Sequence, residues 1–309
     1  MSSSRTTSRP RILDGGLATE LERIGEPVDA PWWTNKPLLV GARRERLRAL
    51  HEEFVDAGAE VLTANTFRCN RRTLRGLGFD PSSGMAWMVH AAVGTAQAAA
   101  RRSPSVRTAA SVGPVADCYR PEAVPSDEEL RAEHRWLATE LARCGIELFL
   151  VETMNTVREA RIAVEEAVAV GGVPWVGFVC GDGGRLLSGE PVAEAAGAVR
   201  EAGARLVAVN CTDLVRTETA LAALRADDGG AIGAYPNLED RRAPRTAGGR
   251  GPHPSALGPE DFAEVVAGWD AEFGLDLVGG CCGTTPDHVA ALRRAVREAA
   301  GTAARDARP

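Results

Sequence analysis

The stretches LFLVE at 148–152 and RLVAVN at 205–210 decide the fold class of this chain. Each is an almost unbroken apolar run that ends on a polar side chain. A strand with one face in water alternates apolar and polar residues, whereas a strand of a parallel sheet is covered on both faces and is apolar throughout. The two runs therefore predict buried strands of a parallel sheet.

Six further short runs resemble these two, and helical patterns lie between them. The expected strands are 11–14, 60–64, 107–112, 147–152, 175–180, 205–210, 231–235 and 276–280. In segment 44–57, Leu47, Leu50 and Phe54 recur at the spacings of one helix face, and segment 191–202 has the same pattern. Successive strand–helix units predict a single-domain (β/α)8 barrel, with a doubly wound open sheet as the alternative.

Two sequence signals mark the starts of helices. Ser126 with Glu129 three residues later has the pattern of a capping box. Thr285 directly before Pro286 places a capping hydroxyl ahead of a first-turn proline. We therefore expect helices to begin at both points.

The composition is typical of a globular protein with one large domain. The 309 residues are 44% hydrophobic and 25% charged, and this length is ordinary for one (β/α)8 barrel. We expect the barrel to span 11–300. A disordered N-terminal tail at 1–10 and a C-terminal tail at 301–309 would flank it.

Charge and apolar patterning argue against two classes of partner. The net charge is −6, and no basic stretch is interleaved with aromatic residues, so we expect no nucleic-acid partner. No apolar run approaches the roughly 20 residues of a membrane-spanning helix, and the first ten residues lack a signal-peptide core. Seven cysteines spread through a chain of this size favour reduced thiols and a cytoplasmic setting. The sequence does not indicate an oligomeric state.

Two connections are unusually long, at 113–126 after the third strand and at 236–258 after the seventh. Long loops in compact domains are usually functional or mobile. Both belong to the carboxyl-terminal face of the expected barrel, where such folds build their sites. For the tip of the second loop, a mobile insertion without function is an equal alternative.

Three cysteines stand at the ends of expected strands. Cys211 ends the sixth strand in VAVNC, and Cys281 and Cys282 end the eighth in LVGGCCGTT. Because parallel strands of a barrel deliver their carboxyl ends to one face, these sulfurs can converge across about 70 residues of sequence. Three thiolates around Zn²⁺ leave the fourth tetrahedral position open, as in a catalytic site.

Adjacent cysteines in a regular strand point to opposite faces, so both can bind one ion only where the backbone turns sharply. Gly279, Gly280 and Gly283 flank the pair and permit such dihedral angles. The alternative is a pair of buried structural cysteines in a glycine-rich turn. Cys69, Cys118, Cys144 and Cys180 are interpreted as small buried hydrophobic residues.

At these residues the chain resembles the homocysteine S-methyltransferase family, which includes the betaine-dependent enzyme and the homocysteine domain of cobalamin-dependent methionine synthase. The resemblance extends from about Ile12 to Leu292. The stretches that carry it are LDGGLATEL (13–21), AGAEVLTANTF (57–67), VET (151–153), NC (210–211) and GGCCGTTPDHV (279–289). It implies a (β/α)8 barrel in which zinc binds the three cysteines and the sulfur of homocysteine.

The resemblance also implies a pocket for the amino acid. Asp14 and the backbone of Gly15 and Gly16 would hold the amino and carboxylate groups, and Glu152 would pair with the amino group. This agrees with the need of an ammonium for a carboxylate and of a carboxylate for backbone donors. Alternatively, Asp14 is a turn residue and Glu152 a surface carboxylate. Asn65 and Asn210 also stand at strand ends. Each is either a site residue or a spacer that binds only backbone groups.

The segment PWWTNKP (31–37) is similar to a tryptophan-containing stretch of the family. The faces of Trp rings attract methylated cations. Trp33 is therefore the first candidate for the methyl-donor site and Trp32 the second, with core packing as the alternative. The chain departs from the family pattern in three loops that would shape this pocket. They read RCNRRTL (68–74), DCYRPEAVPS (117–126) and YPNLED (235–240).

We therefore expect zinc-dependent transfer of a methyl group from a sulfonium donor to the thiol of L-homocysteine, which forms methionine. S-methylmethionine is the first candidate donor and S-adenosylmethionine the second. The partners would be these small molecules alone. The alternatives are a betaine-type donor, another acceptor such as selenocysteine, and a non-catalytic barrel that senses zinc or redox state.

Overall fold

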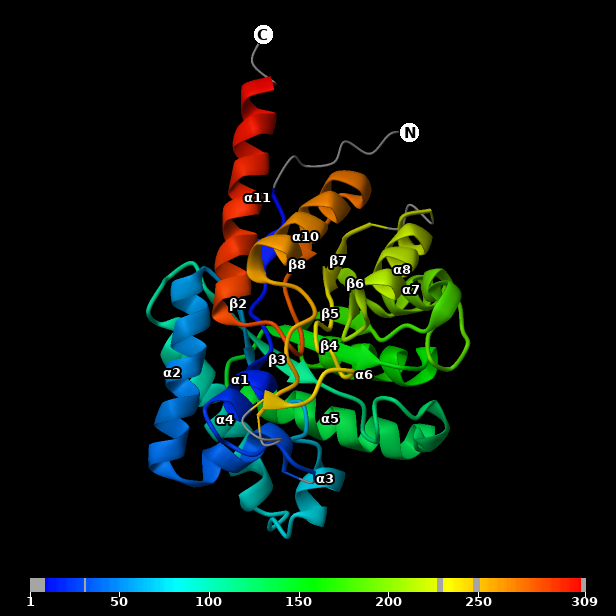
Figure 1. The fold of residues 1–309 in the computed structure, drawn as a ribbon. Helices are drawn as coiled ribbons and strands as arrows, with labels where there is room; N and C mark the ends of the chain where they lie inside the picture. Colours follow the sequence, from blue (N-terminus) through cyan, green and yellow to red (C-terminus); the bar gives the residue numbers. More distant parts are fainter. Residues whose placement is uncertain (1–8, 31, 227–229, 247–250, 307–309) are drawn as a thin grey trace.

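Eight parallel strands, each followed by helical structure, close into a barrel in the computed structural model of the chain, which describes residues 9–30, 32–226, 230–246 and 251–306 (Figure 1). Neighbouring strands follow the order β1-β8-β7-β6-β5-β4-β3-β2, and a parallel bridge between Leu13 and Val61 joins the first strand to the second. The strands are β1 Arg11–Ile12, β2 Val61–Ala64, β3 Arg107–Val112, β4 Leu148–Met154, β5 Val173–Phe178, β6 Leu206–Asn210, β7 Ile232–Tyr235 and β8 Leu277–Val278. All eight expected strands are confirmed, and so is the (β/α)8 barrel.

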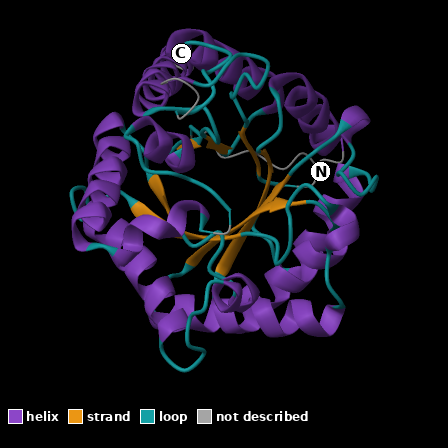
Figure 2. Cartoon of the chain, turned by 60° about the horizontal axis from the view of Figure 1, so that its bottom comes forward, coloured by secondary structure: helices purple, strands orange, loops and turns teal. Residues whose placement is uncertain are grey.

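Helices surround the strands as an outer ring (Figure 2). The α-helices are α1 Leu17–Arg23, α2 Gly41–Ala57, α3 Arg71–Gly76, α4 Gly84–Ala100, α5 Asp127–Arg143, α6 Val157–Ala169, α7 Val192–Ala202, α8 Leu214–Ala226, α10 Pro259–Phe273 and α11 Pro286–Asp306. Three short 3-10 helices add to them: η1 Trp33–Leu39, η2 Pro121–Ala123 and η3 Asp182–Gly184. None of the helices in the described ranges is long and apolar enough to cross a membrane.

The expected helix faces and helix starts are present. Leu47, Leu50 and Phe54 of α2 are buried, because their spacing places them on the face that packs against the barrel. The Ser126 hydroxyl accepts a hydrogen bond from the Glu129 amide at 3.4 Å and caps α5. The ends of the chain are described in part: residues 1–8 and 307–309 lie outside the described ranges, and α11 continues to Asp306.

Alternation along the strands divides their side chains between two cores. Phe149 and Val151 of β4 point outward, into the large core between strands and helices, whereas Leu148 and Leu150 point into the barrel. The inner core comprises Leu13, Val61, Ala109, Leu148, Leu150, Trp175, Leu206, Ala208, Tyr235 and Leu277. The next inward position of β4 toward its carboxyl end is Glu152, so strand alternation itself directs this carboxylate into the barrel.

Candidate metal centre and amino-acid pocket

Cys211, Cys281 and Cys282 come together at the carboxyl ends of β6 and β8. Their three sulfur atoms lie within 4.8 Å of one another, and this is the one cluster of potential metal ligands in the described residues. All three side chains are partly buried and form no disulfide. The predicted convergence of the three sulfurs is therefore confirmed.

The backbone turns sharply at both cysteine-bearing strand ends. Cys211 has a φ angle of 50°, in the left-handed region that residues with a Cβ rarely adopt, and this turns it out of the strand β6. After Cys282, Gly283 has a φ angle of 80°, and a Cβ there would lie 2.7 Å from the Glu239 amide nitrogen. Glycine is therefore required at 283 on both grounds.

The expected role of Gly279 and Gly280 as residues with unusual dihedral angles was wrong. Neither has a positive φ angle. They are needed for close packing instead, because a Cβ on Gly279 would lie 2.6 Å from the Leu13 Cβ, and one on Gly280 would lie 2.3 Å from Thr284. The turn of the Cys-Cys segment lies at Cys282 and Gly283, and the Thr284 amide closes it by donating to the Cys281 carbonyl at 3.2 Å.

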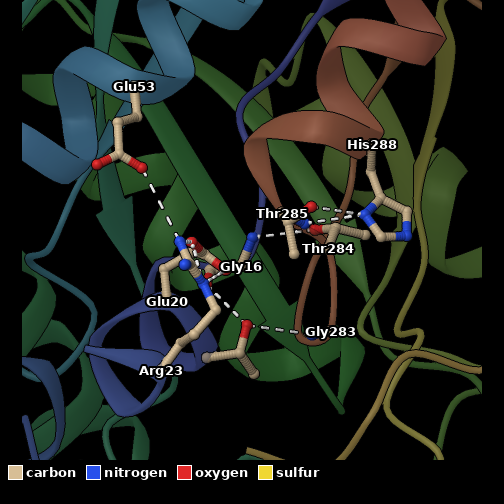
Figure 3. Close-up of polar contacts among 9 residues, drawn as sticks. Gly16, Glu20, Arg23, Glu53, Gly283, Thr284, Thr285 and His288 are labelled. Carbon is tan, nitrogen blue, oxygen red and sulfur yellow. Dashed lines mark hydrogen bonds and ion pairs between the residues drawn. The ribbon is translucent and has the colours of Figure 1, made fainter. Parts of the chain in front are cut away.

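The Cys-Cys segment is fixed by hydrogen bonds to the first strand–helix connection (Figure 3). The Gly16 amide donates to the Thr284 carbonyl at 3.0 Å, and the Gly283 amide donates to the Thr19 hydroxyl at 3.2 Å. A Cβ on Gly16 would lie 2.5 Å from the Cys281 carbonyl oxygen. The sequence DGG at 14–16 thus lets the first connection pack directly under the cysteines.

The start of α11 and the loop after β7 support the same segment. The Thr285 amide donates to Nδ1 of His288 at 3.2 Å, which is the reciprocal half of a capping box with histidine in the place of glutamate (Figure 3). On the other side, the Cys281 amide donates to the Pro236 carbonyl at 2.9 Å, and the Leu238 amide donates to the Cys282 carbonyl at 2.8 Å. The base of the loop 236–258 therefore holds the cysteines, and part of its tip, 247–250, lies outside the described residues.

Interactions among the three thiols shift their pKa values in different directions. Cys281 and Cys282 donate to Cys211 and lower its pKa well below the usual value. The pKa values of Cys281 and Cys282 are raised, in each case chiefly by the interaction with Cys211. By contrast, burial raises the pKa of Cys69 and Cys180 to about 12, as expected of thiols that serve as small hydrophobic residues.

The donor set fits a zinc ion. Zinc binds thiolates at about 2.3 Å in tetrahedral geometry, which requires sulfur atoms about 3.8 Å apart. The three sulfurs satisfy this with small adjustments, and an all-thiolate set is preferred by soft or borderline metals over Mg²⁺ or Ca²⁺. The described residues supply three ligands and no fourth, so the fourth coordination position would be open to a ligand from outside.

Two carboxylates lie beside the cysteines inside the barrel. Asp14 is 3% exposed and accepts hydrogen bonds from the Thr63 amide and hydroxyl, both at 2.7 Å. Glu152 accepts a hydrogen bond from the Ser111 hydroxyl. The pKa of Asp14 is raised to about 7 and that of Glu152 to about 8, in both cases chiefly by burial. The charges of Asp14 and Cys211 contribute to the raised pKa of Glu152.

In the described part of the chain, neither carboxylate forms an ion pair with an arginine, lysine or histidine (Figure 3 shows, for contrast, Glu20 paired with Arg23). Buried carboxylates are normally paired, because ionisation without a partner is costly. In the described residues, no protein cation therefore offsets the charge that either carboxylate carries when it is ionised.

A bulge in β4 directly follows Glu152. The pairing of β4 with β5 shifts register between Val151 and Met154, and Thr153 has a φ angle of 59°. Asn210 holds this bulge: its Oδ1 accepts from the Thr153 amide at 3.0 Å and its Nδ2 donates to the Thr153 hydroxyl at 2.9 Å. Asn210 is fully buried, so its amide group is used for backbone support next to the site.

Other polar groups at the barrel mouth lack a partner. Asn65 donates to the Thr34 carbonyl at 3.0 Å, but its Oδ1 is buried and makes no hydrogen bond within the described ranges. The same holds for the Tyr235 hydroxyl, whose pKa is raised by burial and by the charge of Glu152. The Gly16 amide is already bound to Thr284, whereas the Gly15 amide appears in none of the described hydrogen bonds.

The two adjacent tryptophans differ in environment. Trp32 packs edge-on against Phe79, with ring centroids 5.9 Å apart, and belongs to the core. Trp33 is 41% exposed, has a φ angle of 47°, and lies 5.5 Å from the guanidinium carbon of Arg68. One part of the Trp33 ring therefore already contacts a protein cation, and the exposed part is available to a ligand.

Sequence reasoning missed several residues of this site. Ser111 and Tyr235 lie at inward strand positions among apolar neighbours and gave no signal of their own. Arg241, ion-paired with Glu239 at 3.1 Å, helps to lower the pKa of Cys211, and the Tyr119 hydroxyl lies 3.2 Å from the Cys211 sulfur. Tyr119 and Arg241 stand in or next to the loops that depart from the family pattern, and that departure was the available signal.

Comparison with known proteins adds to this geometry. The family model described as homocysteine S-methyltransferase matches residues 11–296. Homocysteine S-methyltransferase 4 of Zea mays is 30% identical, over 93% of this chain and 90% of the relative. Selenocysteine Se-methyltransferase of Brassica oleracea var. italica is 28% identical, over 92% of this chain and 88% of the relative.

Among solved structures, the metallated form of the homocysteine methyltransferase MmuM from Escherichia coli is similar over nearly the whole fold. It has a TM-score of 0.79 and 25% sequence identity, and the match covers 93% of this chain and 96% of that one. The similarity thus extends over most of the fold.

Proposed function

The chain belongs to the homocysteine S-methyltransferase family, and from this we propose that it transfers a methyl group from a sulfonium donor to the thiol of L-homocysteine with the help of zinc. The family is a class of methyltransferases that act on small molecules. Homocysteine as the acceptor, the sulfonium donor and the identity of the metal belong to the proposal.

One observation carries the choice of acceptor: three convergent thiols lie beside two buried carboxylates that have no cation in the described residues. A molecule that satisfies both groups must present a sulfur at one end and an ammonium at the other. Homocysteine has this form. Its ammonium would stabilise Asp14 and Glu152 in their ionised state, which burial alone disfavours.

Each residue of the site has a role in this reaction. Cys211, Cys281 and Cys282 would hold the zinc, which would keep the homocysteine sulfur as a nucleophilic thiolate at neutral pH. Glu152, next to the Asn210-supported bulge, and Asp14, fixed by Thr63, would orient the amino acid.

Three further polar groups complete the proposed pocket. They are the Gly15 amide, as a donor to the carboxylate of the substrate, and the Asn65 Oδ1 and Tyr235 hydroxyl, which have no partner within the described ranges. The Gly16 amide supports the Cys-Cys segment instead. These groups would fix the distance between the amino acid's ammonium and its sulfur.

The charge of the site favours a cationic donor. Three thiolates on a divalent ion give a net charge of −1, and the bound substrate thiolate makes it −2, so transfer from a sulfonium reduces the charge that the protein must stabilise. The exposed part of the Trp33 ring offers an aromatic surface to such a cation. S-methylmethionine is the first candidate and S-adenosylmethionine the second.

The test is methionine formation by the zinc-loaded protein with homocysteine and three separate donors: S-methylmethionine, S-adenosylmethionine and betaine. Turnover with a sulfonium donor supports the proposal. Turnover with betaine alone would replace the donor, and turnover with selenocysteine but not homocysteine would replace the acceptor. Tightly bound zinc without turnover of any pair would favour the non-catalytic alternative.

A further inference from the structure

The connection between β3 and α5 carries an aromatic side chain to the cysteine cluster. This side chain is Tyr119, in the loop 113–126. The residue is 43% exposed at the barrel mouth. Its hydroxyl nevertheless lies 3.2 Å from the Cys211 sulfur. In the described residues, this is the one hydrogen bond that reaches any of the three sulfurs from outside the cluster.

Buried side chains from two other connections hold the backbone that leads to Tyr119. Asn155, after β4, donates to the carbonyls of Asp117 at 3.3 Å and Cys118 at 2.9 Å. Arg68, after β2, donates to the Ala116 carbonyl at 2.6 Å. Three consecutive carbonyls, the last directly preceding Tyr119, are therefore each bound by a buried side chain.

A third anchor lies at the start of this segment. The carboxylate of Glu159, in α6, is 0% exposed and accepts a hydrogen bond from the Val115 amide at 2.7 Å. The Tyr119 amide itself donates to the Asp117 carboxylate at 2.9 Å. The four residues before Tyr119, 115–118, are thus each bound by a side chain from elsewhere in the fold. The backbone that carries Tyr119 is therefore rigid, although its ring is open to solvent.

We infer that Tyr119 is a positioning residue of the metal centre, whose hydroxyl donates a hydrogen bond to the sulfur of Cys211 when that sulfur is a metal ligand. The inference rests on the proposed function. The direction of the bond follows from chemistry, because a metal-bound thiolate has lost its proton and can only accept.

The hydrogen bond would serve an anionic site in two ways. It withdraws electron density from the one ligand that is contributed by β6, so less negative charge remains to be stabilised around the metal. It also fixes the rotamer of Cys211. This residue stands at a strained backbone position and has no second cysteine next to it in the sequence. The backbone of Cys281 and Cys282 is held by hydrogen bonds to Pro236 and Leu238, whereas that of Cys211 has one within the described residues, to the Tyr235 carbonyl at 3.2 Å.

The test compares the unaltered full-length protein with Tyr119→Phe, which keeps the ring and removes the hydroxyl. Both are loaded with Co²⁺ as a spectroscopic substitute, and the sulfur-to-metal charge-transfer band is recorded without substrate. Loss of a hydrogen bond raises the energy of the sulfur lone pairs, so the band of Tyr119→Phe is expected at longer wavelength. In chelator competition, its zinc affinity is expected to fall by about tenfold.

The control is Arg120→Gln, on the same loop, since Arg120 is exposed and its ion pair in the described residues is with Glu122 at 2.8 Å. It is expected to match the unaltered protein in band position and in zinc affinity. A second variant, Asn155→Ala, keeps the hydroxyl but removes the anchor of the loop, and it is expected to shift the band in the same direction by less.

The outcomes separate this inference from the function on which it rests. A red-shifted band and weaker zinc binding in Tyr119→Phe, absent from Arg120→Gln, support the role of the hydroxyl. Identical spectra and affinities for Tyr119→Phe and the unaltered protein would overturn that role alone. No charge-transfer band in the unaltered protein would overturn the metal centre itself.

Discussion

The two inward-facing layers of the barrel lie on the same strands but differ in what they contribute. Leu148 and Leu150 of β4 are fully buried among apolar side chains, whereas Glu152, at the next inward position, is a carboxylate whose pKa is raised to about 8. The same change from apolar to polar occurs on β6 between Ala208 and Asn210. The lower layer stabilises the fold by apolar burial, whereas the upper layer buries polar groups, at a cost in stability that we attribute to the proposed site.

The largest expected effect comes from the ends of the strands, above both layers. Cys281→Ala removes one of three metal ligands, and we expect it to abolish both zinc retention and turnover, because two thiolates do not hold the ion tightly enough. Zinc content and methionine formation are measured after dialysis. Cys144→Ala, a partly buried cysteine far from the cluster, serves as the control and should retain both. Turnover by Cys281→Ala after complete removal of zinc would contradict the account.

Glu152→Gln is expected to have opposite effects on binding and on folding. It would remove the proposed partner of the substrate ammonium, so kcat/KM for homocysteine should fall by about 100-fold or more. The folded-state pKa of Glu152 lies above its unfolded value, so the protein binds more protons when folded, and stability is lost as the pH rises toward 8. Glu152→Gln has no carboxyl group at this position to ionise, so it does not lose this stability as the pH rises.

Thermal unfolding of the substrate-free proteins measures the second effect. The Tm advantage of Glu152→Gln should grow as the pH rises from about 5 to 8 and level off above that, where the carboxyl is ionised in both states. A pH-independent difference would mean that Glu152 is not a desolvated carboxylate. Unchanged kcat/KM for homocysteine would mean that it does not contact the amino acid.

Leu150→Ala, two residues before Glu152, should show the reverse behaviour. It leaves a cavity in the lower layer and is expected to lower the free energy of unfolding by about 2–5 kcal/mol. Urea unfolding measures this loss, and the KM for homocysteine is measured at a temperature where the variant is folded. A rise in KM comparable to that of Glu152→Gln would show that the two layers are not separate in function.

Trp33→Ala is expected to have the smallest effect of the four. An exposed or partly desolvated cation–π contact contributes about 0.5–2 kcal/mol, so the donor KM should rise by roughly 2- to 30-fold while the homocysteine KM changes little. The Arg68 guanidinium already lies 5.5 Å from this ring, which places the effect toward the lower end. Equal changes in both KM values would mean that Trp33 only packs.

The sequence was sufficient for the fold and for the convergence of the three cysteines. The strands of a parallel barrel are apolar on both faces, so runs such as LFLVE stand out from the helices. The position of a residue at the end of such a strand determines the face on which it lies, and this allowed Cys211 to be placed beside Cys281 and Cys282 although about 70 residues separate them.

The sequence was insufficient where geometry depends on partners distant along the chain. Glu152 could be placed at a strand end, but the sequence did not show the bulge at Thr153 directly after it, where Asn210 of β6 binds both the amide and the hydroxyl of Thr153. Similarly, the role of Tyr119 depends on anchors after β2 and β4. Such hydrogen bonds have no periodicity, so no local pattern predicts them.

In the glycine-rich turn, too, the local sequence did not show which role each residue has. Gly279, Gly280 and Gly283 look alike in sequence, yet only Gly283 has a positive φ angle, and the other two leave room for Leu13 and Thr284. The reason lies in what packs against them, which local sequence does not contain.

The central claim is that three cysteine sulfurs hold zinc and leave its fourth position to the homocysteine sulfur. The most direct measurement is X-ray absorption at the zinc edge, before and after addition of homocysteine. The account predicts three sulfur ligands at about 2.3 Å before addition and four afterwards. An unchanged number of sulfur ligands after homocysteine has bound would contradict it.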